Sequence, residues 1–203
     1  MPRVPPEAAA GLPGWMEDVR RRLAGRAIHA LPEAEGLRRA GVLLPLFVRE
    51  GALWIVFTLR TDSVEHHRGQ ISFPGGGEEE GDGTLWHTAL RESEEELGIR
   101  PDDALALGRL SPLTTVTNFY VEPFVAAIPQ PYSFRPAPAE IAEVLEVPIP
   151  ALLDPAVLET RRLPGREEPV LFYRYEDRVI WGATARMLAE LLEALGGEAA
   201  ARR

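Results

Sequence analysis

The sequence of 203 residues contains no cysteine and no lysine, so all 22 of its basic residues are arginine. The lack of cysteine excludes disulfide bonds, thiolate nucleophiles and cysteine-bound metals, and it fits a reducing compartment. The lack of lysine excludes a P-loop lysine and a Schiff-base lysine. No apolar run approaches the roughly 18 residues that span a membrane, and residues 1–14 lack the apolar centre of a signal peptide. We therefore expect a cytoplasmic protein without a membrane partner.

The charge and the length limit the class of protein further. A net charge of −9 argues against a general nucleic-acid binder, but it is compatible with a phosphorylated substrate held through metal ions. The composition, 45% hydrophobic and 26% charged, is that of an ordinary globular chain. We predict an N-terminal arm with a short helix over residues 1–37, a single domain over 38–195 and a tail over 196–203. The arm is a candidate element for a homodimer.

Apolar periodicity and turn residues predict the elements. The predicted helices are a short one through Trp15, Val19 and Leu23 that ends at Gly25, and three over residues 84–97, 139–146 and 184–195. The predicted strands cover residues 42–48, 53–59, 104–110, 121–128, 160–163 and 170–175, with the first two and the last two as hairpins. Residues 73–77 and 129–138 are predicted as loops. This mixture indicates an α+β or mixed α/β fold.

The predicted helix over residues 84–97 has an unusual concentration of glutamate. At about 100° per residue, Trp86, Leu90, Ser93 and Leu97 form one side, the predicted buried side. Three carboxylates, Glu92, Glu95 and Glu96, form the other, with Arg91 one turn before Glu95. Such carboxylates repel one another unless a cation lies between them, and oxygen ligands suit Mg²⁺ or Mn²⁺. The alternative is a solvated acidic helix face.

A glycine-rich segment, Gly69–Gly77, precedes this helix. Glycine lets the backbone turn sharply and approach a ligand closely. A carbonyl in this segment could bind a metal ion, and free N–H groups could face phosphate oxygens. A glycine-rich segment about fifteen residues before Arg-Glu-x-x-Glu-Glu-x-Gly is a much more specific signal than either feature alone.

The stretch from Gly76 to Ile99 resembles the Nudix box, G-x5-E-x7-R-E-U-x-E-E-x-G-U, where U is apolar. Three features depart from it: Asp82 replaces the first glutamate, eight residues rather than seven separate it from Arg91, and Ser93 replaces an apolar residue. The first two departures are similar to the Nudix branch that includes coenzyme A pyrophosphatases.

Further segments resemble the same branch. They are Arg60, His67-Arg68-Gly69-Gln70-Ile71-Ser72-Phe73-Pro74-Gly75-Gly76, Glu140–Val144 ahead of Val147-Pro148, and Ile180–Arg186. Thr61 departs from it, since the branch more often has serine there. The resemblance covers most of residues 38–195 and implies a Nudix-type α/β/α sandwich with a mixed central sheet.

The resemblance implies metal-dependent hydrolysis of a diphosphate bridge. Glu92, Glu95 and Glu96 would bind Mg²⁺ or Mn²⁺, and the Gly76 carbonyl is a further candidate ligand. Arg91 would orient a glutamate through a charge-assisted hydrogen bond. Two residues are candidates for the general base, Glu92 and Glu140. For Glu140 the alternative is a cap of the predicted helix that follows it.

The resemblance to the coenzyme A branch implies that coenzyme A would be hydrolysed to 3′,5′-ADP and 4′-phosphopantetheine. Arg60 and Arg68 are candidate partners of the 3′-phosphate, with Arg38 and Arg39 behind them. Each arginine could equally be a surface charge. His67 could donate to phosphate or shape the adjacent turn.

Gln70 is a candidate for contact with the substrate, and the alternative is a purely structural role. Phe119, Tyr120 and Trp181 could stack on adenine, but buried aromatic residues more often belong to the core, where we place Trp181.

Two other functions stay open at this point. The chain could hydrolyse another diphosphate, such as ADP-ribose, NADH or a nucleoside triphosphate. It could also be a Nudix-fold protein that senses a nucleotide without hydrolysing it. That function would require a damaged metal cluster, whereas all three helix carboxylates are present.

Overall fold

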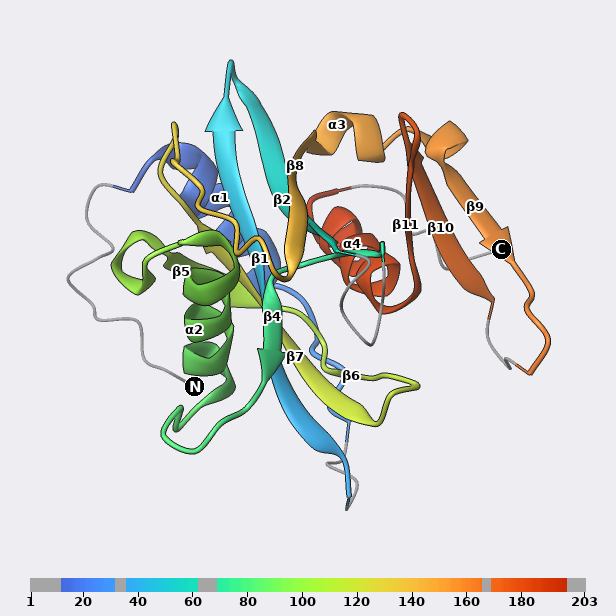
Figure 1. The fold of residues 1–203 in the computed structure, drawn as a ribbon. Coiled ribbons are helices and arrows are strands. Elements are labelled where there is room, and N and C mark those ends of the chain that lie inside the picture. Colours follow the sequence, from blue (N-terminus) through green and yellow to red (C-terminus); the bar gives the residue numbers. More distant parts are fainter. Residues whose placement is uncertain (1–11, 32–35, 62–68, 166–168, 197–203) are drawn as a thin grey trace.

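A mixed β-sheet forms the centre of the computed structural model, which describes residues 12–31, 36–61, 69–165 and 169–196 (Figure 1). Its strands are β1 (Arg38–Arg49), β2 (Ala52–Arg60), β3 (Ile71–Ser72), β4 (Gly75–Gly77), β5 (Leu105–Arg109), β6 (Leu113–Thr114), β7 (Phe119–Ala127) and β8 (Ile141–Pro148). The main path is β3-β2-β1-β7-β5, with β4 paired to β1, β6 to β7 and β8 to β2. The sheet is mixed because β1 runs parallel to β7 and antiparallel to its other partners.

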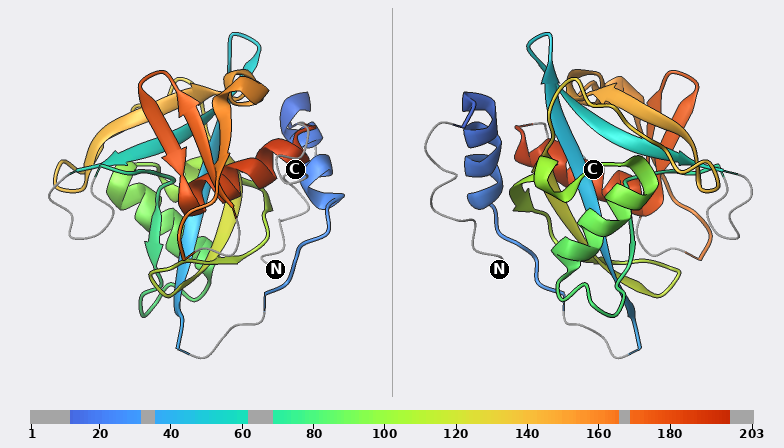
Figure 2. Two further views of the ribbon diagram at one scale, coloured as in Figure 1. Left: turned by 90° about the vertical axis from the view of Figure 1, so that its right-hand side faces the viewer. Right: turned by 60° about the vertical axis from the view of Figure 1, so that its left-hand side comes forward.

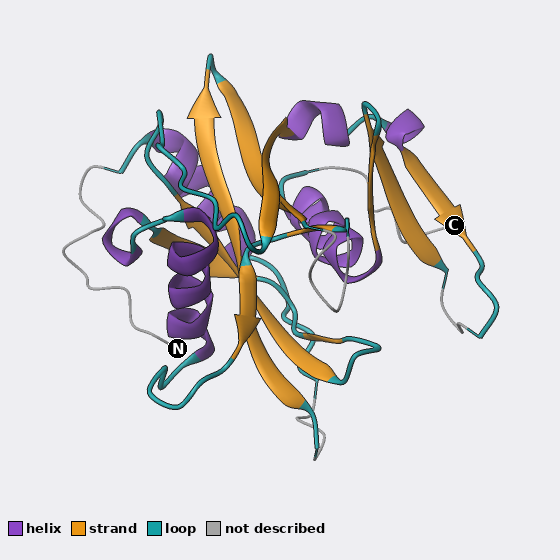
Figure 3. Ribbon diagram, in the orientation of Figure 1, coloured by secondary structure: helices purple, strands orange, loops and turns teal. Residues whose placement is uncertain are grey.

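In the described part of the chain, four α-helices and a second, smaller sheet pack around the central sheet (Figure 3). The helices are α1 (Gly14–Ala24), α2 (Leu85–Leu97), α3 (Ile149–Leu152) and α4 (Gly182–Ala194), with 3₁₀ turns at Pro101–Asp103 and Pro155–Val157. The smaller sheet consists of β9 (Leu158–Arg161), β10 (Val170–Tyr175) and β11 (Arg178–Trp181) in the order β11-β10-β9.

Helices cover both faces of the central sheet (Figure 2). On one face Leu43 and Phe47 of β1 join a cluster with Leu85, Ala89 and Leu97 of α2. On the other face a larger cluster contains residues of β1, β2, α1 and α4: Leu44, Leu46, Ile55, Val19, Leu23, Leu188 and Leu191. Strand β1 is therefore apolar on both faces, as buried strands are. The prediction of an α/β/α sandwich with a mixed sheet is confirmed.

Most of the predicted elements are present with slightly different bounds. The hairpin of β1 and β2 turns at Glu50 and Gly51, which both have positive φ, 52° and 78°. That is the pattern of a type I′ turn, which suits the twist of two adjacent strands. The second predicted hairpin is also confirmed, as β9 and β10.

The helix predicted over residues 139–146 is wrong, because this segment forms β8 along the side of β2. Ile141, Val144 and Leu145 have the i, i+3, i+4 spacing of a helix. Pairing with β2 overrides that local pattern, and the β-branched residues Ile141, Val144 and Val147 fit a strand well. The notion that Glu140 caps a helix is wrong for the same reason.

One further prediction needs correction, and one strand was missed. Gly75–Gly77 is not a loop but the strand β4, held antiparallel against β1. Strand β11 was not predicted as a strand. Among the described residues no helix is long and apolar enough to cross a membrane.

Candidate active site

Helix α2 carries the acidic residues, and local signals fix its ends. The Thr84 side chain accepts a hydrogen bond from the His87 N–H at the first turn. Gly98 ends the helix in the left-handed region at φ 70°, and its N–H donates to the Glu94 carbonyl. Ser93, which departs from the family pattern, lies in the core and donates to the Ala89 carbonyl at 2.6 Å. The buried hydroxyl is thus satisfied within the helix.

Arg91 joins the helix to the segment before it. Its Nε donates to Asp82 at 3.0 Å and its Nη2 donates to the Gly77 carbonyl at 2.9 Å. Its Nη1 donates to Glu92 at 2.9 Å and to Glu95 at 3.2 Å. Arg91 therefore orients two of the predicted metal-binding carboxylates and fastens the end of β4 to α2.

Asp82 is the residue that holds Arg91 in place. Its carboxylate is 7% exposed and also accepts hydrogen bonds from the Glu79 N–H and from the Thr88 hydroxyl. The bond from Arg91, followed by those from Glu79 and Thr88, lowers the pKa of Asp82 to about 2 against the cost of burial. Asp82 is shorter than the glutamate of the Nudix box, and one additional residue separates it from Arg91. It still contacts Arg91 directly.

Glu92 lies against strand β4, which consists of Gly75–Gly77. A Cβ on Gly76 would come within 2.4–2.5 Å of the Glu92 carboxyl atoms, so no larger residue fits there without moving this carboxylate. Burial raises the pKa of Glu92, Arg91 lowers it, and repulsion from Glu95 and Glu140 raises it again. The carboxylates are therefore close enough to oppose one another's ionisation.

Glu96 is 3% exposed, so it does not belong to a solvated face. Its carboxylate accepts from Arg60 Nη1 at 3.1 Å and from the Gly75 N–H at 3.2 Å. Arg60 Nη2 also lies 3.6 Å from Glu140. Burial raises the pKa of Glu96 to about 7, although Arg60 and the Gly75 N–H favour the charged form and so limit the rise.

The carboxylate set fits a hard divalent cation in its chemistry. All of the donors are oxygen atoms, and repulsion from neighbouring carboxylates contributes to raising the pKa of Glu92 and that of Glu96. Within the described ranges no three acidic or histidine side chains are grouped so that they could hold an ion. Instead Arg91 contacts Glu92 and Glu95, and Arg60 contacts Glu96 and Glu140.

The structure describes some of the other predicted site residues but not all of them. Gln70 accepts through its backbone carbonyl from the Arg60 N–H at 3.1 Å. His67 and Arg68 lie outside the described residues. Arg38 stacks on Phe119 at 4.4 Å from the ring centroid, and Arg39 lies 3.3 Å from Glu78.

The placement of Trp181 in the core was wrong. Its side chain is 38% exposed and stacks on Phe172, with 6.1 Å between the ring centroids. Tyr120 is buried, as a core residue would be. Sequence reasoning also missed the contact of Thr88 with Asp82, for which the only sequence signal is their separation of six residues.

Comparison with known proteins decides the family. The family model described as NUDIX domain matches residues 37–165. The chain belongs to the Nudix family. The prediction of a Nudix-type hydrolase is thereby confirmed at the level of the family.

Relatives and solved structures agree with this assignment. A protein of Photorhabdus laumondii named "Uncharacterized Nudix hydrolase NudL" is 35% identical over 159 residues, 77% of this chain and 84% of the relative. A protein of the same name from Escherichia coli is 33% identical over 170 residues, 78% and 83% of the two chains. A MutT/nudix family protein from Enterococcus faecalis shares the fold, with a TM-score of 0.50 at 14% identity over 84% of this chain and 64% of that one.

Proposed function

We propose that this Nudix protein hydrolyses the diphosphate bridge of coenzyme A, giving 3′,5′-ADP and 4′-phosphopantetheine. The position of Glu92 and Glu96 supports the proposal of a hydrolase. These two side chains face strand β4 at Gly76 and Gly75. The specific substrate rests on the resemblance of Arg60 and of the segment His67–Gly76 to the coenzyme A branch.

Glu92 and Glu96 would hold Mg²⁺ or Mn²⁺, with Glu95 and the Gly76 carbonyl as further ligands. When bound, such ions neutralise the diphosphate and lower the pKa of the attacking water. Arg91 contributes by holding Glu92 and Glu95 in position. This preorganisation matters because the barrier falls mainly through charges already aimed at the reacting phosphate.

The reaction also needs a group that accepts a proton from water. Glu92 and Glu140 are the two candidates, and they differ in their surroundings. Glu92 is 18% exposed and hydrogen-bonded to Arg91, whereas Glu140 is 53% exposed and lies at the end of the loop before β8. In the proposed step water oxygen forms a bond to phosphorus, the bridging P–O bond breaks, and one of these carboxylates takes the proton of the water.

The 3′-phosphate of coenzyme A would bind guanidinium groups, and Arg60 and Arg68 are the proposed partners. Arg60 is already shared by Glu96 and Glu140. Its substitution would therefore affect both the carboxylates and the substrate. His67 and Gln70 are proposed to shape the adjacent turn or to contact the phosphate.

The first test measures products directly. Purified protein is incubated with coenzyme A, ADP-ribose, NADH and deoxynucleoside triphosphates, each with Mg²⁺ and with Mn²⁺, and the products are separated by chromatography. We expect 3′,5′-ADP from coenzyme A to form faster than any other product. In the Glu92→Gln variant the rate should fall by about 10²-fold or more, because a carboxylate that would hold the metal ion or accept the proton of water is lost.

Glu94→Gln is the matched control, since Glu94 lies on the same helix and is exposed. This variant should keep its activity. Mn²⁺ should raise the melting temperature of the wild type and of Glu94→Gln, but raise that of Glu92→Gln less, because a bound ion stabilises the folded state. Preferred hydrolysis of another diphosphate would refute the coenzyme A proposal while keeping the hydrolase. No turnover with either metal would favour a sensing protein.

A further inference from the structure

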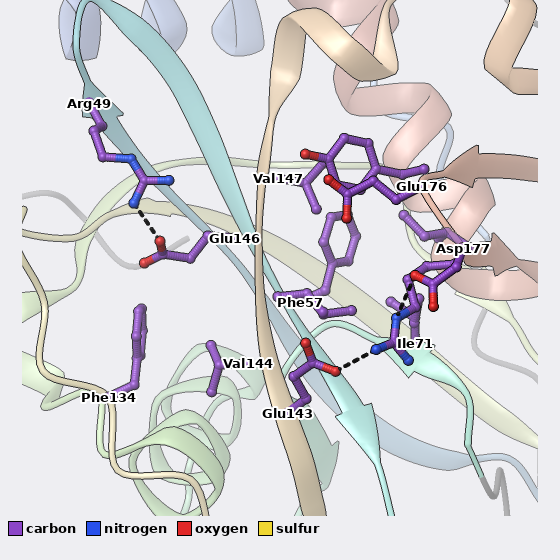
Figure 4. A pocket seen from close by; sticks show the side chains of 14 residues that line it. Arg49, Phe57, Ile71, Phe134, Glu143, Val144, Glu146, Val147, Glu176 and Asp177 are labelled. Carbon is purple, nitrogen blue, oxygen red and sulfur yellow. Dashed lines mark hydrogen bonds and ion pairs between the residues drawn. The ribbon is translucent and has the colours of Figure 1, made fainter.

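A cleft of about 380 Å³ follows strand β8, away from the carboxylates of α2. Figure 4 shows Phe134 and Val144 on one side of the strand, and Phe57 and Glu143 on the other. The turn Tyr175–Arg178 between β10 and β11 forms the far wall. The cleft thus lies between the central sheet and the smaller sheet, with β8 running through it.

Strand β8 has a free edge in this cleft. In the described part of the chain it pairs with β2 alone, and no other described group is hydrogen-bonded to the backbone of residues 142–147. In an antiparallel strand alternate residues direct their N–H and C=O groups to the outer side. Such an edge is a template for another extended chain that carries amide groups.

The charges in the cleft disfavour phosphate. Its lining includes four carboxylates and two guanidinium groups, a net charge of −2: Glu143, Glu146, Glu176, Asp177, Arg49 and Arg178. Both arginines are already paired, Arg49 with Glu146 at 2.6 Å and Arg178 with Glu143 at 2.8 Å. The apolar side chains between these pairs favour an uncharged occupant with both polar and apolar groups.

Strand β8 connects the cleft to the candidate active site. Strand β8 begins directly after Glu140, which lies 3.6 Å from the same Arg60 that holds Glu96. At roughly 3.3 Å per residue, the segment from Ala142 to Val147 extends about 17 Å from there. A chain that leaves a diphosphate bound at the carboxylates can therefore run along the open edge.

We propose that this cleft binds the pantetheine arm of coenzyme A, an inference that rests on the proposed function. The arm is uncharged and extended, and it carries two secondary amides and a geminal dimethyl group. An amide of the arm pairs with the outer N–H and C=O groups of β8, as an added strand would. The dimethyl group packs against Val144 and Phe134, and the ion pairs on the two sides stay intact.

Val144→Trp tests the proposal by filling the cleft. We expect the KM for coenzyme A to rise tenfold or more while kcat stays within about twofold, because the arm binds away from the reacting phosphate. D-Pantetheine alone should inhibit the wild type competitively and inhibit the variant at least tenfold less. Val116→Trp is the matched control, since Val116 is 69% exposed and does not line the cleft, and it should behave as the wild type.

A second measurement does not depend on a variant. D-Pantetheine is titrated into ¹⁵N-labelled wild-type protein without metal, and the amide signals of residues 142–147 should shift more than those of α2. An unchanged KM in folded Val144→Trp, or shifts elsewhere in the protein, would overturn the proposal. Shifts with spermidine and none with pantetheine would assign the cleft to an amine and overturn it too. If the wild type does not hydrolyse coenzyme A, the proposed function fails, and the titration still decides whether the cleft binds pantetheine.

Discussion

Asp82 is the residue on which the position of Arg91 depends. The aspartate accepts from two nitrogens of Arg91, from the Thr88 hydroxyl and from a backbone N–H, and its side chain is almost fully buried. Arg91 in turn donates to Glu92 and Glu95. A substitution of Asp82 therefore changes the position of these two carboxylates, although Asp82 does not contact them. The aspartate thus acts on the site through Arg91.

We predict that Asp82→Asn destabilises the protein by about 2 kcal/mol at pH 7, since the pKa of Asp82 falls from 3.8 to about 2 on folding. A lowered carboxyl pKa adds stability that is fully present above the unfolded pKa and is lost as the pH falls from about 4 to 2. The difference between the wild type and the variant should therefore shrink across that range. Urea unfolding between pH 2.5 and 7 measures it.

Asp102→Asn is the control for this prediction, because Asp102 is exposed. Its free energy of unfolding should match the wild type at each pH. A constant difference between Asp82→Asn and the wild type from pH 7 down to 2.5 would show that the charge of Asp82 is not the source of the stability.

At the scale of the elements, close backbone contacts hold α2 to the sheet. A Cβ on Gly41 of β1 would lie 2.0 Å from the backbone oxygen of Leu85 in α2, so the helix and the strand touch through their backbones. A Cβ on Gly76 of β4 would instead meet the end of the flexible Glu92 side chain. Gly41 therefore allows the helix to pack closely on the sheet, whereas Gly76 leaves room for the Glu92 carboxylate in the site.

We predict that Gly41→Ala destabilises the protein by about 3 kcal/mol, because the backbones must separate. Gly76→Ala should cost less than about 1 kcal/mol but reduce kcat/KM by about 10²-fold, since the Glu92 carboxylate has to move. Thermal unfolding and the product assay measure the two effects.

Gly14→Ala should change neither quantity, since among the described residues no atom beyond its own helix and chain neighbours lies within 4 Å of the added Cβ. Full activity of Gly76→Ala would contradict the proposed position of Glu92 in the site.

At the scale of the whole molecule, the core extends past the part that matches the family. The match ends at residue 165, but Tyr173 of β10, Ile180 of β11 and Leu188 of α4 are almost completely buried in the same cluster as β1 and β2. The segment after residue 165 thus covers one face of the central sheet. This agrees with the predicted domain over residues 38–195, which stays a prediction.

We predict that a chain ending at residue 165 does not fold, because one face of the sheet loses its cover, whereas a chain ending at residue 196 keeps its melting temperature. The milder change Leu188→Ala should cost about 3 kcal/mol. Circular dichroism during thermal unfolding compares the three proteins with the wild type. A cooperative transition in the chain ending at 165 would contradict the prediction of one domain.

The sequence by itself determined the elements whose signals are local. Helix α2 follows from its apolar spacing, from Thr84 at its start and from Gly98 at its end, and the β1–β2 hairpin follows from two apolar runs around Glu50 and Gly51. The arrangement of Arg91 with Glu92 and Glu95 is local as well, since these residues lie within about one helical turn. The resemblance to the Nudix box rests on the same short stretch and its spacing.

Only the tertiary structure decided the features whose partners are distant along the chain. Residues 141–148 form a strand because β2 offers them hydrogen-bond partners about 80 to 95 residues earlier in the chain. Glu96 is buried beside Arg60, 36 residues away, whose guanidinium donates to its carboxyl group. Trp181 lies at the end of β11, an edge strand of the smaller sheet, where its ring stacks on Phe172 and stays 38% exposed. Burial and pairing depend on what the rest of the chain brings to a residue, and local periodicity does not contain that information.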